Sequence, residues 1–178
     1  MNPVSIIIFG EIKVRSRLNT PAHVIVPTIR GRNVSLLAAM NIHGIIDSQV
    51  ISSSSVNSTI FISFLDGLFH KLAERNILEA WLVLDNAKIH KTQEVRDKIN
   101  ETRHKLIFLS PYSPMLNPIE KVFSKIKLSA RNMLAEPENT LNLVNIIKES
   151  VATVTSANCN NYYVDMSMKL PLAEQLLH

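Results

Sequence analysis

Two carboxylates occupy the positions in this sequence that are best suited to chemistry. The first, Asp85, directly follows WLVL (81–84), a continuous apolar run typical of a buried strand. An acid at the end of such a strand projects over the sheet edge where ligand sites of α/β proteins form. A structural role is the alternative, because Asn86 follows and a helix is expected soon after, so that Asp85 also suits a turn or a helix N-cap.

The second carboxylate, Glu120, lies in LNPIEKVF (116–123), where Pro118 is suited to the first turn of a helix. The helix dipole stabilises an acid in a first turn, which is the structural alternative. The apolar positions of this helix, however, leave Glu120 at the border of the buried stripe, on an edge shared with Lys127 and Arg131. A carboxylate placed there suits a cleft that contains phosphate.

Several other chemistries lack the residues that they need. The glycines (positions 10, 31, 44 and 67) are too far apart for a Walker loop or a GxGxxG turn. Cys159 is the only cysteine, which excludes an intrachain disulfide and a Cys-rich zinc site, and no two histidines have HxxxH spacing. The apolar runs are shorter than a membrane span of about 20 residues, and the N-terminus lacks signal-peptide features. We therefore expect no membrane partner and no small-molecule cofactor.

Basic residues gather in the sequence around the two acids. The chain carries 19 Lys and Arg against 15 Asp and Glu, giving a net charge of +4 and a pI near 9.3. Such a mild excess permits polyanion binding, although it is also normal for a solvated surface. The candidate phosphate contacts are Arg30, Arg32, Lys88, Lys91, Lys121, Lys125, Lys127 and Arg131.

The elements that must position these residues follow a mixed α/β pattern. Strands are expected at 4–9, 23–26, 34–40, 46–52, 81–84 and 106–109. Helices are expected from an N-cap at Asn57 or Ser58, over 92–103, after Pro118 and from near Pro137. Residues 156–178 are weakly patterned and are expected to form a loop and a short helix. This order predicts one domain over 1–178, a mixed sheet flanked by helices.

Two segments carry a more specific signal. WLVLDNAKIH (81–90) and LSPYSPMLNPIEKVFSKIK (109–127) resemble the second and third motifs of the mariner-type DDE transposases. The 34 residues 86–119 separate Asp85 from Glu120, which is the spacing typical of the Glu-ending branch of that superfamily. The segment VPTIRGRNVSLLAAMN (26–41) also resembles the middle strands of this domain.

The resemblance implies a ribonuclease-H-like fold and a magnesium-dependent reaction that cuts and rejoins DNA strands. In this family three carboxylates hold two Mg²⁺ ions, or Mn²⁺ in their place, and Asp85 and Glu120 would be both catalytic residues and metal ligands. Hard cations of this kind take oxygen ligands and need no Cys or His. The supporting residues would be Asn86 and His90 in the strand-end loop and Asn117 and Pro118 before the helix of Glu120. Duplex DNA is the implied partner and the nucleus the implied location, and a homodimer is left open.

The sequence departs from the family at its first motif. Where the family has Asp followed by Glu, this chain has Gly10 followed by Glu11. An alternative register, counted back from residues 14–17, places the missing Asp near or before Met1, so the Asp is lacking in both registers. Glu11 is the remaining candidate for a third metal ligand, although an acid beside Gly also suits an exposed turn. The family's N-terminal helix-turn-helix segment is also not found. We therefore expect a truncated or decayed copy that binds DNA and has lost efficient cleavage. The alternatives are an active nuclease or transposase that uses Glu11, and a non-catalytic nucleic-acid-binding relic.

Overall fold

The computed structural model describes residues 4–8, 12–14, 34–52, 56–110, 116–136 and 141–175. The strand expected at 23–26 and the candidate residues Glu11, Arg30 and Arg32 lie outside the described residues. Everything that follows concerns the described part of the chain.

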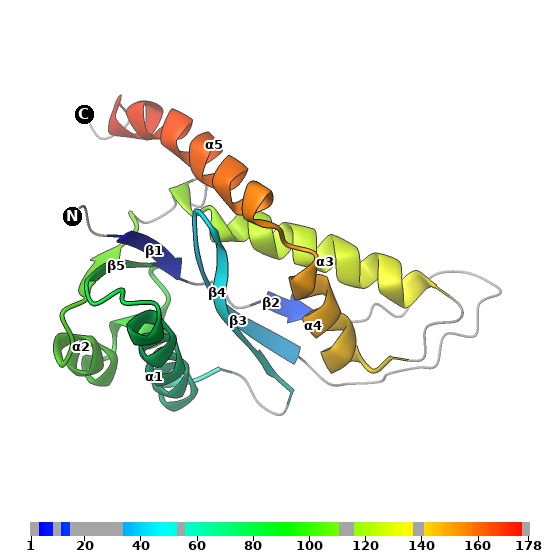
Figure 1. Ribbon diagram of the computed structural model, residues 1–178, viewed down its shortest axis with the longest axis horizontal. Coiled ribbons are helices and arrows are strands. Elements are labelled where there is room, and N and C mark those ends of the chain that lie inside the picture. Colours follow the sequence, from blue (N-terminus) through cyan, green and yellow to red (C-terminus); the bar gives the residue numbers. More distant parts are fainter. Residues whose placement is uncertain are drawn as a thin grey trace.

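The described strands form a single mixed sheet (Figure 1). Its order is β2–β3–β1–β5–β6, and β4 also pairs with β3. Because β4 runs along one edge of β3, β1 and β2 pair with successive stretches of the opposite edge. The strands β1, β5 and β6 are parallel, whereas β3 is antiparallel to β1, β2 and β4. Their bounds are β1 (Val4–Ile8), β2 (Ile12–Val14), β3 (Val34–Asn41), β4 (Gly44–Ile51), β5 (Ala80–Leu84) and β6 (Lys105–Phe108).

The parallel pairing of β1 with β5 determines which segments meet at one edge of the sheet. Ile7 lies opposite Val83, and Val83 lies opposite Ile107, so that the three strands end at the same edge. Asp85 follows β5 there, and Gly10 and Glu11 follow β1 in the sequence. The strands expected at 4–9 and 81–84 are therefore neighbours in the sheet.

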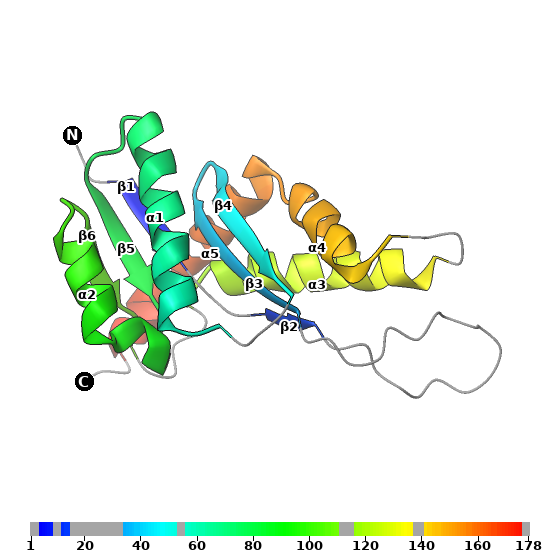
Figure 2. The same ribbon diagram turned by 90° about the horizontal axis from the view of Figure 1, so that it is seen from below.

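Helices cover both faces of the sheet (Figures 1 and 2). On one face, α1 (Ser58–Glu74) and α2 (Gln93–Asn100) pack on side chains of β3 and β5. These side chains include Leu37, Ala39 and Leu82. On the other face, α3 (Ile119–Ala135), α4 (Leu143–Ala152) and α5 (Ser156–Gln175) pack on Leu36, Ala38 and other residues of β3. Residues of β3 point to the two faces in turn, which is the period of a strand buried on both sides.

The first helix forms where the sequence predicts it. The Asn57 side chain accepts a hydrogen bond from the Ile60 N–H at 2.9 Å, which caps the helix and confirms one of the two expected N-cap residues. The predicted apolar stripe is buried throughout and consists of Phe61, Phe64, Leu65, Leu68 and Leu72. The stripe explains why α1 lies flat on the sheet.

Several elements differ from the prediction. The helix expected from near Pro137 begins only at Leu143, because the Asn142 side chain accepts from the Asn145 N–H at 3.0 Å and caps it there. Residues 156–175 form one long helix, α5, instead of a loop and a short helix. The helix expected over 92–103 ends at Asn100 and is preceded by a 3₁₀ turn, η1 (Lys88–Lys91). The short strand β2 was not predicted.

None of the described helices is both long enough and apolar enough to cross a bilayer.

Candidate active site

Asp85 is held at the carboxyl end of β5 by two hydrogen bonds to one of its oxygens. Asp85 Oδ1 accepts from the Ala87 N–H at 2.9 Å and contacts His90 Nδ1 at 2.8 Å. Burial is the largest single influence on the Asp85 pKa and raises it, but the hydrogen bonds from His90 and Ala87 and the charge of His90 together outweigh burial. The pKa of Asp85 therefore lies below its ordinary value, and the group is a carboxylate at neutral pH.

The loop after β5 is folded back so that it can provide these contacts. The 3₁₀ turn η1 begins after Ala87, whose carbonyl accepts from the His90 N–H at 3.0 Å. The His90 ring is buried and packs on the Phe61 ring of α1, with 4.5 Å between the ring centroids. Asn86 donates from its side-chain amide to the Leu109 carbonyl, which ties the end of β5 to the segment after β6. Asn86 and His90 thus both contribute to the strand-end loop.

Glu120 lies in the first turn of α3, next to a rigid helix start. Asn117 and Pro118 are buried before it, and the Asn117 carbonyl accepts from the Glu120 N–H at 3.1 Å. Pro118 occupies the N-cap position with φ of −64°, a value that its ring imposes and that suits a helix start. The neighbouring residues Ile119 and Val122 are buried in the core, which fixes the direction of the helix while Glu120 itself is exposed.

The two carboxylates influence one another electrostatically. Burial is the main reason that the pKa of Glu120 lies above its ordinary value, and the negative charge of Asp85 is the second reason. The positive charge of Lys127 acts in the opposite direction and is the weaker influence. A like charge shifts a pKa only at short range, so Asp85 and Glu120, 35 positions apart in the sequence, lie in the same region of the fold.

No third metal ligand joins Asp85 and Glu120 within the described residues. Among the described residues, no three or more His, Cys, Asp and Glu side chains form a group that could hold a metal ion. Glu11 lies outside the described residues, so its predicted role as a ligand stays a prediction.

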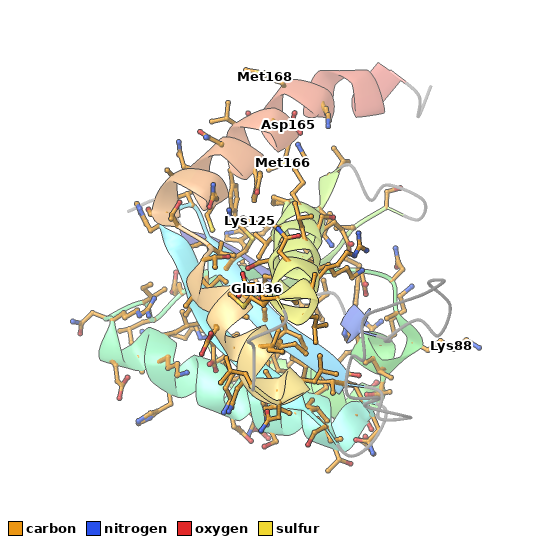
Figure 3. The ribbon with its side chains drawn as sticks, turned by 90° about the vertical axis from the view of Figure 1, so that its right-hand side faces the viewer. Lys88, Lys125, Glu136, Asp165, Met166 and Met168 are labelled. Carbon is orange, nitrogen blue, oxygen red and sulfur yellow. The ribbon has the colours of Figure 1, made fainter. Side chains whose placement is uncertain are left out.

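The predicted phosphate contacts in the described part of the chain fall into separate groups. Lys127 and Arg131 are exposed on the face of α3 that carries Glu120. Lys88 and Lys91 belong to η1, beside Asp85, and Lys91 also lies 5.6 Å from the centroid of the Phe108 ring. Figure 3 shows Lys88 projecting into solvent well apart from Lys125. The candidate bases therefore do not form one continuous patch.

Lys121 has a partner that the sequence did not reveal. Its ammonium group forms an ion pair with Asp165 of α5 and lies 5.9 Å from the centroid of the Tyr162 ring. Asp165 also pairs with Lys169 at 2.8 Å, and hydrogen bonds from Lys121 and Lys169 hold the pKa of Asp165 below its ordinary value. The i,i+4 spacing of Asp165 and Lys169 is visible in the sequence, but the contact with α3 had no sequence signal.

Comparison with solved structures shows which fold this is. The structure matches the Mos1 transposase paired-end complex with left transposon end at a TM-score of 0.70 and 16% identity, covering 93% of this chain and 52% of that one. It matches a Mos1 transposase catalytic domain, solved with Raltegravir and Mg, at 0.66 and 18%, covering 94% and 78%. A simian T-cell lymphotropic virus intasome in complex with the PP2A regulatory subunit B56 gamma matches at 0.59 and 14%, covering 85% and 48%. The predicted ribonuclease-H-like fold is confirmed.

Similarity at the level of sequence identifies the family. No curated protein matches the chain at a significant level. The chain spans about half the length of the Mos1 transposase chain in the paired-end complex. The profile of one family, described as DDE superfamily endonuclease, matches residues 14–142, which include both Asp85 and Glu120 and make up most of the sequence. The chain therefore belongs to the DDE superfamily endonuclease family.

Proposed function

We propose that this chain is a transposase-derived domain that binds duplex DNA and a divalent cation at Asp85 and Glu120, and that it cleaves DNA poorly. The observation that carries the proposal is that both acids lie in the segment 14–142 matched by the DDE superfamily endonuclease profile, Asp85 directly after β5 and Glu120 in the first turn of α3. A carboxylate after a strand and a carboxylate at a nearby helix start repel each other, and a cation between them relieves that repulsion.

The donors at this site fit Mg²⁺ or Mn²⁺. Both residues offer carboxylate oxygens, which hard cations prefer, and the Asp85 carboxylate is ionised at neutral pH. When bound, the cation would supply Lewis-acid stabilisation of a phosphodiester oxygen and activation of the attacking water or hydroxyl. The similar Mos1 transposase catalytic domain was solved with Mg, which supports this choice of metal.

Duplex DNA is the proposed partner because exposed bases flank the two acids. Lys127 and Arg131 share the face of Glu120, and Lys88 and Lys91 follow Asp85. Contacts of this kind bind phosphate without regard to sequence and weaken as salt rises. The similar Mos1 transposase structure is a complex with a transposon end, which supports a DNA partner. A DNA partner also agrees with the nuclear localisation that we propose.

Weak cleavage follows from the number of carboxylates. A two-metal site shares a bridging acid between its ions, and the sequence lacks the family's Asp in either register of the first motif, with Gly10 at its position in one of them. Loss of one stabilising donor at a developing oxyanion costs on the order of 100-fold in rate or more. The alternatives, an active enzyme that uses Glu11 and a relic that binds DNA without cleaving it, give different results in the same assay.

Nicking of supercoiled plasmid tests the proposal. We expect little nicking by the unmodified chain with Mg²⁺ or Mn²⁺, and a rise of about 100-fold in Gly10→Asp. The same rise should be absent when Gly10→Asp is combined with Asp85→Ala or with Glu120→Ala. Robust nicking by the unmodified chain that either alanine substitution abolishes would instead identify an active enzyme and favour Glu11 as the third ligand.

Salt-dependent binding to duplex DNA tests the partner separately. The logarithm of the affinity should fall linearly with the logarithm of the salt concentration, and Lys127→Gln should reduce the slope by about 0.9. Lys121→Gln should reduce it less, because Asp165 already pairs with Lys121. Lys71→Gln is the matched control, since Lys71 of α1 pairs with Asp47 of β4 and should leave the slope unchanged. Absence of binding at low salt contradicts a DNA partner.

A further inference from the structure

Two histidines pack on phenylalanine rings of α1, but only one of them contacts an acid. His90 lies 4.5 Å from Phe61, and His104 lies 5.1 Å from Phe69, centroid to centroid. His90 Nδ1 contacts Asp85 Oδ1 at 2.8 Å, whereas His104 Nδ1 is buried and has no hydrogen-bond partner among the described residues. The shared packing accounts for a structural role of both rings, and the contact with Asp85 is specific to His90.

Both hydrogen bonds to the Asp85 side chain end on the same oxygen. The Ala87 N–H and His90 Nδ1 both contact Oδ1, and Oδ2 has no hydrogen-bond partner among the residues that the structure describes. A carboxylate oxygen offers about two acceptor positions, so two donors use the capacity of Oδ1. The Ala87 N–H and the buried His90 ring therefore hold one carboxylate oxygen inward and leave the other without a donor.

We propose that His90 is a positioning residue that holds Asp85 Oδ1 and thereby presents Oδ2 alone to the divalent cation, so that Asp85 binds the cation through one oxygen. This inference rests on the proposed function, because it assumes that Asp85 is a metal ligand. His90 does not touch the cation in this arrangement. Its Nδ1 carries the hydrogen, because Oδ1 is an acceptor that already receives the Ala87 N–H. Partners of this kind orient ligands in many metal sites.

The test compares Mn²⁺ affinities, measured from the electron paramagnetic resonance signal of free Mn²⁺. His90→Asn retains a donor at the δ position, whereas His90→Leu retains apolar volume against Phe61 and removes the donor. We expect His90→Leu to bind Mn²⁺ about 10-fold more weakly than the unmodified chain, and His90→Asn to stay within about 3-fold of it. If the His90 ring only fills space, His90→Asn should bind Mn²⁺ more weakly than His90→Leu, since Leu packs better than Asn on Phe61. His104→Leu is the matched control and should leave the affinity unchanged.

A spectroscopic measurement on the unmodified chain avoids any dependence on how well the variants fold. The Nδ1 proton of His90, assigned by its loss in His90→Asn, should give a distinct imidazole resonance in ¹H–¹⁵N spectra. It should persist when Mg²⁺ saturates the site, because the cation uses Oδ2. Loss of this resonance on addition of Mg²⁺ would show that the cation takes Oδ1 and would overturn the proposal.

The outcomes also separate this inference from the proposed function. If Asp85→Asn and Glu120→Gln abolish Mn²⁺ binding while His90→Leu binds as tightly as the unmodified chain, the role of His90 is wrong and the metal site stands. If the unmodified chain does not bind Mn²⁺ through these two acids, both are wrong. Weakening by His90→Leu with recovery in His90→Asn supports both.

Discussion

The two acids of the site are presented in different ways by the loop after β5 and by the first turn of α3. Asp85 accepts two hydrogen bonds on one oxygen, and its pKa is lowered despite burial. Glu120 is exposed as a residue, and its carboxylate has no hydrogen-bond partner among the described residues. Partial desolvation of this carboxylate by the surrounding protein, together with the charge of Asp85, raises its pKa. The strand-end acid is therefore fixed in its ionised form before any ligand arrives, whereas the helix acid is ionised at a cost that a nearby cation would remove.

The difference lies in the local backbone. The loop after β5 turns back within five residues, so that Ala87 and His90 both reach Asp85. The start of α3 is held by core packing of Ile119 and Val122, which fixes the backbone but provides no donor to the Glu120 side chain. Rigid placement of one ligand beside an adjustable one suits a site that must accept both a cation and a phosphate group.

The largest effect should appear in metal affinity, where the two acids are expected to behave alike. Asp85→Ala and Glu120→Ala should each weaken Mn²⁺ binding by more than the roughly 10- to 100-fold that loss of a supporting residue causes, since each removes a charged ligand. Calorimetric titration with Mn²⁺ measures this. Glu136→Ala is the matched control, because Glu136 is an exposed acid at the other end of α3 (Figure 3). An equal loss in Glu136→Ala would indicate nonspecific attraction of the cation.

The two acids should differ in stability. Asp85→Ala should lower the free energy of unfolding at pH 7 by about 1–3 kcal/mol, because the buried His90 ring and the Ala87 N–H lose their acceptor. Glu120→Ala should change it by less than about 0.5 kcal/mol, as expected for an exposed side chain. Urea unfolding of the metal-free chain measures both values. Equal destabilisation by the two substitutions would contradict the difference in hydrogen bonding between Asp85 and Glu120.

The smallest expected effect is on the pH dependence of folding stability, to which Glu120 and Asp85 contribute with opposite signs. The folded pKa of Glu120 lies above the ordinary value of 4.5, so its ionisation disfavours the folded state, and stability is lost as the pH rises through the folded pKa. Glu120→Gln should thus gain at most about 0.5 kcal/mol over the unmodified chain at pH 7, because solvent screens an exposed group, and the gain should vanish below pH 4.5.

Asp85 should show the reverse dependence. Its folded pKa lies below the ordinary value of 3.8, so its contribution to stability is present above that value and is lost as the pH falls through the folded pKa. Unfolding curves between pH 3 and pH 7 compare the two residues. A Glu120→Gln variant that is less stable than the unmodified chain at pH 7 would contradict the repulsion between the two acids.

The sequence predicted the parts of this fold whose patterns are local. The continuous run WLVL identified β5, and Pro118 followed by an apolar stripe identified the start of α3. It failed for α5, because this long helix buries only a narrow strip that includes Cys159 and Tyr163, so no apolar periodicity marks it. The late start of α4 depends on the cap at Asn142, whereas the prediction rested on the preference of Pro137 for a first turn.

The candidate site was predicted from residue types and family spacing, but its geometry was not. The sequence placed Asp85 and Glu120 after a strand and at a helix start, and it assigned His90 to the loop without its partner atom. The hydrogen bonds on a single carboxylate oxygen depend on how η1 closes, and the contact of Lys121 with Asp165 depends on the packing of α5 on α3. Both are tertiary effects without a period or a motif in the sequence.

The anomalous scattering of Mn²⁺ in crystals of the unmodified chain would locate the cation itself. We expect an anomalous peak between Asp85 Oδ2 and the Glu120 carboxylate, with His90 still hydrogen-bonded to Oδ1. The same peak should be absent from crystals of Asp85→Asn grown and soaked in the same way. A peak elsewhere, or no peak at Mn²⁺ concentrations that saturate the chain in solution, would contradict the assignment of these two carboxylates as the metal site.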